Sequence, residues 1–211
     1  MAGRLRLSER LAALPAWVHW AGLCMAAALG ALVMLAADPS RWNWQPALAA
    51  SEPWRAITAA WVHLGPQHLA GNLAATAVVA LLGRSAGCGR RAAVAWALAW
   101  PLTQWGLLVQ PALTAYGGLS GVLHAAVAVV VWQLLRGDRG WRRAIGAALA
   151  AGLLAKLWGE AAWTGGPLRQ VPGWDIAIAP AAHASGALAG WLCALACGVG
   201  SAADQAAPPA P

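Results

Sequence analysis

The chain has 211 residues, of which 60% are hydrophobic and 10% are charged, and its formal net charge is +7. A soluble domain of this length would need far more charged side chains to cover its surface, so the composition argues against that class. The arginines lie in short segments between apolar runs rather than on one face, which argues against a nucleic-acid-binding patch.

Several apolar segments are long enough, or nearly so, to cross a bilayer as helices. The predicted transmembrane helices cover residues 16–37, 68–83, 92–109, 118–135, 144–162 and 176–199. The basic residues before the first segment imitate a signal peptide, but the apolar run is too long for one. We therefore expect an all-α membrane protein with a six-helix bundle in one domain, residues 1–200. A disordered Pro/Ala-rich tail is expected at residues 201–211.

The basic residues also predict the orientation of these helices. Under alternating topology, one side of the membrane receives ten arginines: Arg4, Arg6, Arg10, Arg84, Arg90, Arg91, Arg136, Arg139, Arg142 and Arg143. The other side receives Arg41, Arg55 and Arg169, while Lys156 lies within the fifth segment. By the positive-inside rule, both termini are expected in the cytoplasm. In a Gram-negative bacterium the protein would lie in the inner membrane, with residues 38–67 in the periplasm.

The fourth segment begins with a serine among glycines, in the run YGGLSGVLHA. Gly118 and Gly121 flank Ser120 closely and leave room for backbone approach and tight helix packing. A serine hydroxyl becomes a useful nucleophile when a nearby base removes its proton. The free N–H groups of a helix N-terminus suit a developing oxyanion. The same run also fits a plain small-residue packing motif, so this segment alone leaves both interpretations open.

The sixth segment carries the candidate base, His183, in the run AHASGALAG. Gly186 and Gly190 follow at the spacing that lets one helix approach another closely, which could bring the imidazole within reach of Ser120. No Asp or Glu is expected to orient this histidine, so we predict a Ser–His dyad rather than a triad. By itself, a lone membrane histidine fits packing or an interhelical hydrogen bond equally well.

A third polar pair begins the second segment. His68 and Asn72 are four residues apart on one helix face and could donate to the same oxyanion. By the predicted topology this pair, Ser120 and His183 all lie near the outer ends of their helices. Three unrelated packing motifs at one depth are hard to explain, which favours a common site. The cysteines show no metal-binding spacing, and we expect neither a metal nor a cofactor.

The runs EPWRAITAAWVHLGPQHLAGN, YGGLSGVLHA and AHASGALAG, in this order, resemble the rhomboid family of intramembrane serine proteases over about residues 15–200. The resemblance implies that Ser120 attacks the peptide carbonyl, with His183 as general base and then general acid. It implies that the oxyanion is stabilised by His68, Asn72 and the N–H of Ser120. It also implies an outer loop, lying partly in the membrane, that is shaped by Glu52, Trp54 and Arg55.

One position departs from the family pattern. Many rhomboids carry a tyrosine four residues after the serine, where its ring supports the histidine, and here that residue is His124. An imidazole can stack or hydrogen-bond in the same place, but it can also titrate. Together with Lys156 and Glu160, this run is similar to the bacterial rhombosortase branch. That branch implies a protein-sorting protease whose substrates end in a GlyGly-CTERM anchor, with a glycine-rich motif, a membrane helix and a basic tail.

Lys156 and Glu160 lie four residues apart and can form an ion pair on one helix face. In rhomboids the fifth helix borders substrate entry, so the pair could serve substrate recognition or gating. Alternatively, both side chains extend to the membrane boundary. His63 is expected to brace the outer loop by hydrogen bonding, and His19 to be a boundary residue.

Several functions fit the resemblance. The leading hypothesis is a rhombosortase-type protease that acts on membrane-anchored proteins and binds no nucleic acid. The alternatives are a general rhomboid protease that cuts other single-span proteins and a non-proteolytic, client-binding relative. Retention of both Ser120 and His183 argues against the second alternative. A transporter is less consistent, because the polar residues cluster at an outer depth rather than at the midplane.

Overall fold

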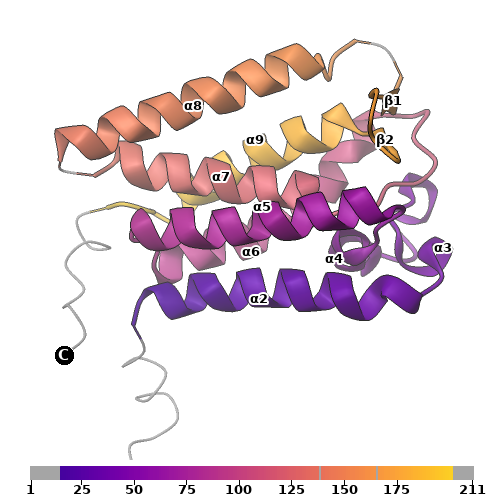
Figure 1. Ribbon diagram of the computed structural model, residues 1–211, viewed down its shortest axis with the longest axis horizontal. Helices are drawn as coiled ribbons and strands as arrows, with labels where there is room; N and C mark the ends of the chain where they lie inside the picture. Colours follow the sequence, from indigo (N-terminus) through magenta and orange to yellow (C-terminus); the bar gives the residue numbers. More distant parts are fainter. Residues whose placement is uncertain (1–14, 138, 165, 202–211) are drawn as a thin grey trace, which may run out of the picture.

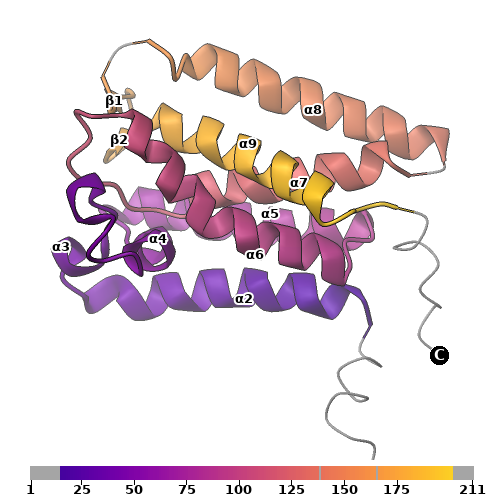
Figure 2. The same ribbon diagram turned by 180° about the vertical axis from the view of Figure 1, so that it is seen from behind.

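The computed structural model describes residues 15–137, 139–164 and 166–201. Its long helices run alongside one another (Figures 1 and 2), and in chain order they are α2 (Trp17–Val33), α5 (Pro66–Ser85), α6 (Arg90–Trp105), α7 (Ser120–Leu135), α8 (Gly140–Glu160) and α9 (Pro180–Ala196). Each predicted segment thus overlaps one of these helices, although α5, α6 and α8 begin before the predicted bounds. The first three arginines of the orientation argument and all of the predicted tail except Ser201 lie outside the described residues.

Shorter elements connect these helices. They are the 3-10 turns η1 (Met34–Ala36), η2 (Pro46–Leu48), η3 (Ala59–Trp61) and η4 (Gly106–Val109), the short helices α3 (Pro39–Trp42) and α4 (Arg55–Thr58), and the strands β1 (Arg169–Gln170) and β2 (Ala177–Ile178). Figure 1 shows α3, α4 and the two strands at the end of the bundle opposite the start of α2 and the end of α9. These connections therefore gather at one end of the bundle, where α7 and α9 begin.

The sixth helix begins later than predicted. Residues 176–179 were expected in the helix, but β2 within this stretch pairs antiparallel with β1, and α9 starts at Pro180. Proline disfavours helical geometry at the residue before it and is favourable in the first helical turn. Ala179 accordingly has φ −111° and ψ 89°. The prediction was wrong because apolarity alone does not separate a helical turn from a short strand.

Within the described part of the chain, two helical stretches are long and apolar enough to cross a membrane by length and composition, Trp17–Ala36 and Arg90–Val109. The helix Ser120–Leu135 is apolar but shorter. The helix α8 lies along the outside of the bundle (Figure 1), and its one buried residue is Gly146. Its exposed face includes Leu154 and Trp158.

The contact between α7 and α9 is made by backbone surfaces. A Cβ atom built on Gly186 would overlap the carbonyl oxygen of Gly121, and one built on Gly190 would overlap that of Ala125. Close helix approach of this kind requires residues without a side chain. The predicted close approach of the sixth helix to a neighbour is therefore confirmed, and the neighbour is the helix that begins with Ser120.

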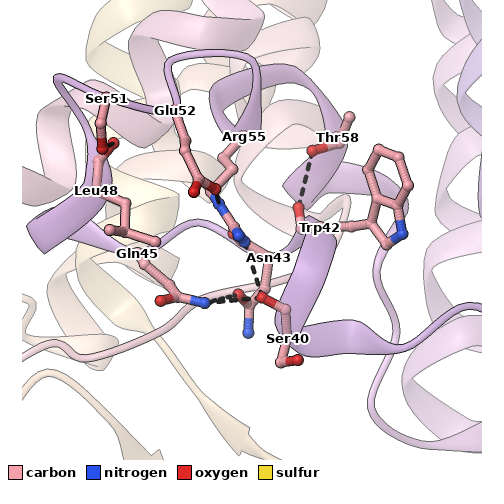
Figure 3. A network of polar contacts seen from close by, with 9 residues as sticks. All are labelled: Ser40, Trp42, Asn43, Gln45, Leu48, Ser51, Glu52, Arg55 and Thr58. Atoms are coloured by element: carbon pink, nitrogen blue, oxygen red, sulfur yellow. Dashed lines mark hydrogen bonds and ion pairs between the residues drawn. The ribbon is translucent and has the colours of Figure 1, made fainter.

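The loop between α2 and α5 is held by a buried arginine (Figure 3). Arg55 pairs with Glu52, and its Nη1 donates to the carbonyl oxygens of Ser40 at 2.9 Å and Asn43 at 3.0 Å. Thr58 Oγ1 also donates to the carbonyl oxygen of Trp42, at 2.8 Å. The planar guanidinium thus donates to two backbone carbonyl oxygens of the loop and pairs with one carboxylate at the same time. A compact ammonium does not present its donors in this fixed planar arrangement.

Arg55→Lys is therefore expected to lower the free energy of unfolding by about 2 kcal/mol, because the part-buried bonds to the Ser40 and Asn43 carbonyl oxygens lose their shared donor. Thermal unfolding of the detergent-solubilised protein would measure the loss. The matched control is Arg41→Lys, because the Arg41 side chain is 79% exposed and its ion pair with Asp38 spans 3.7 Å. Equal unfolding temperatures for the two variants would contradict the bracing role of Arg55.

Candidate active site

Ser120 and His183 come together at the N-terminal ends of two adjacent helices, α7 and α9. Ser120 is the first residue of α7, and His183 lies in the first turn of α9. The Nε2 atom of His183 is 3.0 Å from the Oγ atom of Ser120, and the imidazole is 7% exposed. Within this distance a serine hydroxyl can donate its proton to an imidazole nitrogen. The tight packing at Gly186 is what allows the two helices to approach so closely.

The other ring nitrogen of His183 contacts a carboxylate. Its Nδ1 atom is 2.6 Å from Oε2 of Glu160, the last residue of α8. The expectation that no Asp or Glu lies where it could orient this histidine is therefore wrong. The sequence places Glu160 and His183 on different helices, and nothing local indicates that the end of one meets the start of the other. The predicted ion pair is confirmed, because Lys156 Nζ lies 2.6 Å from Glu160 Oε1.

His124 supports the ring of His183. The two imidazoles are stacked, with centroids 4.2 Å apart and planes inclined by 14°. The Nδ1 atom of His124 is 2.7 Å from the carbonyl oxygen of Ser120. Because a carbonyl oxygen can only accept, this nitrogen carries the proton. The structure thus bears out the expected stacking of an imidazole in place of the usual tyrosine.

His68 and Asn72 face the loop that precedes Ser120. Both are buried on α5, and a Cβ atom on Gly118 would lie 2.5 Å from the His68 ring and 3.7 Å from Asn72 Nδ2. Gly118 also has φ +129°, which residues with a side chain rarely adopt. Within the described residues, Nδ1 of His68 has no hydrogen-bond partner. Two buried polar side chains of α5 therefore lie against the loop before Ser120, where the sequence predicts oxyanion donors.

His63 orients Asn72 from the loop between η3 and α5. The Nδ2 atom of Asn72 is 3.0 Å from His63 Nε2, and His63 Nδ1 is 3.1 Å from the carbonyl oxygen of Trp61. The carbonyl requires a proton on Nδ1, so Nε2 is free to accept from the amide. Burial lowers the pKa of His63, which favours this neutral form. The bracing role expected of His63 therefore extends to a residue of the site itself.

Sequence reasoning missed Tyr116, the single tyrosine of the chain. Its hydroxyl donates to the carbonyl oxygen of Gly118 at 3.3 Å and accepts from the N–H of Gly121 at 3.4 Å. Burial raises its pKa, so the hydroxyl stays protonated. Its backbone pairs with Trp44 through two hydrogen bonds of 2.7 and 2.8 Å. The available signal was a tyrosine directly before the glycine pair.

The site opens into a recess of about 590 Å³ whose walls include Ser120, His68 and His183. The hairpin before α9 forms part of the wall through Trp174. Its neighbour Asp175 accepts a 2.7 Å hydrogen bond from the N–H of Gln67 in the first turn of α5. The sequence did not predict a role for Trp174 or Asp175. Asp175 and its partner Gln67 are 108 positions apart in the chain, and no local pattern connects them.

A second hollow, of about 460 Å³, lies between α5, α7 and α8 and is lined almost entirely by apolar side chains. It shares Ala75, His124 and Lys156 with the recess. We call this hollow the apolar groove. Its lining meets that of the recess at His124, one turn along α7 from Ser120. Within the described ranges, no cluster of three or more His, Cys, Asp or Glu side chains could hold a metal ion.

The family model described as Rhomboid domain matches residues 50–199, from the loop between α2 and α5 to just past α9. This chain belongs to the rhomboid family. Members of that family are serine intramembrane proteases, so this rhomboid is an integral membrane protein of a protease family that acts on membrane-protein substrates. A search of curated proteins finds no match to this rhomboid.

Proposed function

We propose that this rhomboid is a rhombosortase-type serine endopeptidase that cleaves C-terminal GlyGly-CTERM anchors of surface-destined proteins. The observation that carries the proteolytic part is the 3.0 Å approach of Ser120 Oγ to His183 Nε2 beside a recess. The apolar groove adjoining that recess supports a substrate that arrives from the bilayer. No metal or cofactor takes part in the proposed reaction.

In this reaction Ser120 Oγ attacks the scissile carbonyl carbon while its proton passes to Nε2 of His183. The oxyanion accepts hydrogen bonds from the Ser120 N–H, Asn72 and His68. Collapse of this intermediate breaks the C–N bond, and His183 gives its proton to the departing amine. Water, deprotonated by the same imidazole, then hydrolyses the ester on Ser120.

The proposed architecture has α2, α5, α6, α7, α8 and α9 as the six membrane spans of one domain covering residues 1–200. Both termini would be cytoplasmic, and the recess would open to the periplasm of a bacterial inner membrane. The distribution of arginines supports this orientation. The end of the bundle that holds the start of α2 and the end of α9, opposite the hairpin (Figure 2), would be the cytoplasmic end.

The rhombosortase assignment is supported by His124 in place of tyrosine and by the Lys156–Glu160 pair on α8. A glycine pair at the end of a substrate helix suits the recess, because glycine is a poor helix former and leaves the backbone free to extend. The substrate's own helix would lie against the apolar groove. Its extended glycine segment would then reach Ser120 at the outer end of α7.

Co-expression with a reporter tests the substrate class. The reporter carries a C-terminal glycine pair, an apolar helix and a basic tail, and its release from the membrane is measured by immunoblot. Release is expected with the intact chain and is expected to be lost with Ser120→Ala. Replacing both reporter glycines by leucine should abolish release. Equal cleavage of the leucine reporter would contradict the branch and favour a general rhomboid protease.

Asn72→Ala is expected to lower the cleavage rate about 100-fold, because one oxyanion donor is lost while others remain. The rate is measured with purified protein and the same reporter. Thr76→Val is the matched control, since Thr76 lies one turn further along the same face of α5 and donates to the Asn72 carbonyl oxygen at 2.7 Å. A wild-type rate for Asn72→Ala would remove this amide from the oxyanion site.

A further inference from the structure

We propose that Glu160 is a positioning residue for His183, so that catalysis uses a Ser120–His183–Glu160 triad in which α8 supplies the carboxylate. The proposal rests on the proteolytic function proposed above and deepens it. The two ring nitrogens of His183 have separate partners: Nε2 is 3.0 Å from Ser120 Oγ, and Nδ1 is 2.6 Å from Glu160 Oε2. This is the order of groups that a serine nucleophile, its base and an orienting carboxylate require.

The carboxylate determines which ring nitrogen carries the proton. An ionised Glu160 can only accept, so Nδ1 of His183 donates to it and Nε2 keeps its lone pair for the serine proton. When Nε2 takes that proton, the resulting imidazolium faces a negative charge at 2.6 Å. Glu160 is 14% exposed and His183 is 7% exposed, so water screens this attraction weakly.

Both groups are held on their far sides. Lys156 Nζ is 2.6 Å from the other Glu160 oxygen, Oε1, which leaves Oε2 to the imidazole. The His124 ring, stacked at 4.2 Å, restricts rotation of His183 out of its plane. These contacts orient the carboxylate and the ring toward one another without involving the Ser120 hydroxyl.

Stability alone does not explain a carboxylate at this position. Glu160 ends α8, and the C-terminus of a helix disfavours negative charge. The next residue, Ala161, has φ +45° and ψ 59°, a left-handed conformation that is unfavourable for any residue with a Cβ. Strained backbone and an adverse charge at one helix end are typical of a position retained for function.

The Glu160 carboxylate is supplied by α8, a helix that lies largely exposed on the outside of the bundle. Gly146 is the one buried residue of α8, yet the last side chain of this helix reaches a buried histidine on α9. The apolar groove runs along the same helix. The orientation of His183 therefore depends on where the outer end of α8 lies.

The test compares Glu160→Gln and Glu160→Asp with wild type by two measurements. The first is kcat and KM for the reporter, and the second is the rate at which a small fluorophosphonate probe labels Ser120. Glu160→Gln should lower kcat by about 100-fold or more and slow the labelling in parallel, with KM changed less than about 3-fold. Glu160→Asp should keep an intermediate rate, because it retains the charge on a shorter side chain.

The matched control is Asp38→Asn, another acid-to-amide change. Asp38 accepts from the N–H of Ser40 at 3.0 Å at the start of α3, and asparagine serves equally well there. It should keep wild-type kcat and labelling. Thermal unfolding identifies any variant that fails to fold, in which case Glu160→Asp alone decides the comparison.

Wild-type kcat and labelling in Glu160→Gln, or in Glu160→Asp if only that variant folds, would overturn the positioning role. A raised KM with unchanged kcat and labelling would also overturn it, and would assign Glu160 to substrate recognition. Failure of the proposed function gives a different result: neither reporter cleavage nor Ser120-dependent labelling occurs in the wild-type chain. The two failures are therefore distinguishable.

Discussion

Ser120→Ala and His183→Ala are each expected to lower reporter cleavage by at least about 10⁴-fold, and the double variant should lose little more. The reason is that the hydroxyl and the imidazole act as one unit. Without the base the serine is a weak nucleophile, and without the serine the base has no group to activate. Single-turnover cleavage with purified protein in detergent or vesicles measures the three rates.

The matched control for the nucleophile is Ser185→Ala. Ser185 lies on α9 two residues after His183, but its hydroxyl donates to the Thr103 carbonyl oxygen at 2.8 Å, which directs it away from Ser120. This variant should cleave the reporter at close to the wild-type rate. Wild-type cleavage by Ser120→Ala in the same assay would refute the assignment of the nucleophile.

Gly186→Ala is expected to reduce the cleavage rate by about 10²- to 10³-fold, the effect of moving reacting groups by about 1 Å. The added Cβ atom would overlap the carbonyl oxygen of Gly121, which is backbone and cannot rotate away. The α9 helix must then shift from α7, and the 3.0 Å contact between His183 and Ser120 lengthens. Fluorophosphonate labelling of Ser120 should slow in parallel with cleavage.

The control for this substitution is Gly22→Ala, because nothing lies within 4 Å of a Cβ atom built at that position on α2. It should leave activity unchanged and stabilise the helix by up to about 1 kcal/mol. Gly186→Ala should instead destabilise the protein by about 1–3 kcal/mol through overpacking. If Gly186→Ala labels and cleaves like Gly22→Ala, close packing of α7 and α9 is not what aligns the site.

These substitutions also separate two sources of catalytic geometry. Gly186 determines how near the helices carrying Ser120 and His183 can lie, whereas Glu160 and His124 determine how the imidazole is turned at that distance. A change in helix separation affects both folding and rate, while a change in ring orientation affects mainly the rate. Comparing unfolding temperature with labelling rate across the variants would resolve the two contributions.

Local sequence patterns were sufficient for features that depend on neighbouring residues. The apolar segments predicted the six long helices, and the spacing of Lys156 and Glu160 predicted their ion pair, because residues four apart share a helix face. The small residues Gly186 and Gly190 predicted a close helix contact, because a helix surface without side chains lets another helix approach closely. The polar residues at the helix ends indicated the serine and the histidine that this contact brings together, and the family resemblance then supported both.

Contacts between distant segments required the tertiary structure. No local sequence pattern indicates three of the contacts at the site. They are the approach of Glu160 to His183, the Tyr116 hydroxyl between Gly118 and Gly121, and the hydrogen bond of Asp175 to α5. The short strand β2 before Pro180 likewise depends on its pairing with β1. The sequence by itself thus determined the helices and the small-residue faces through which α9 packs closely on its neighbour. Packing of the whole bundle sets where each helix ends. Only the tertiary structure therefore decided that Glu160, at the end of α8, meets His183, near the start of α9.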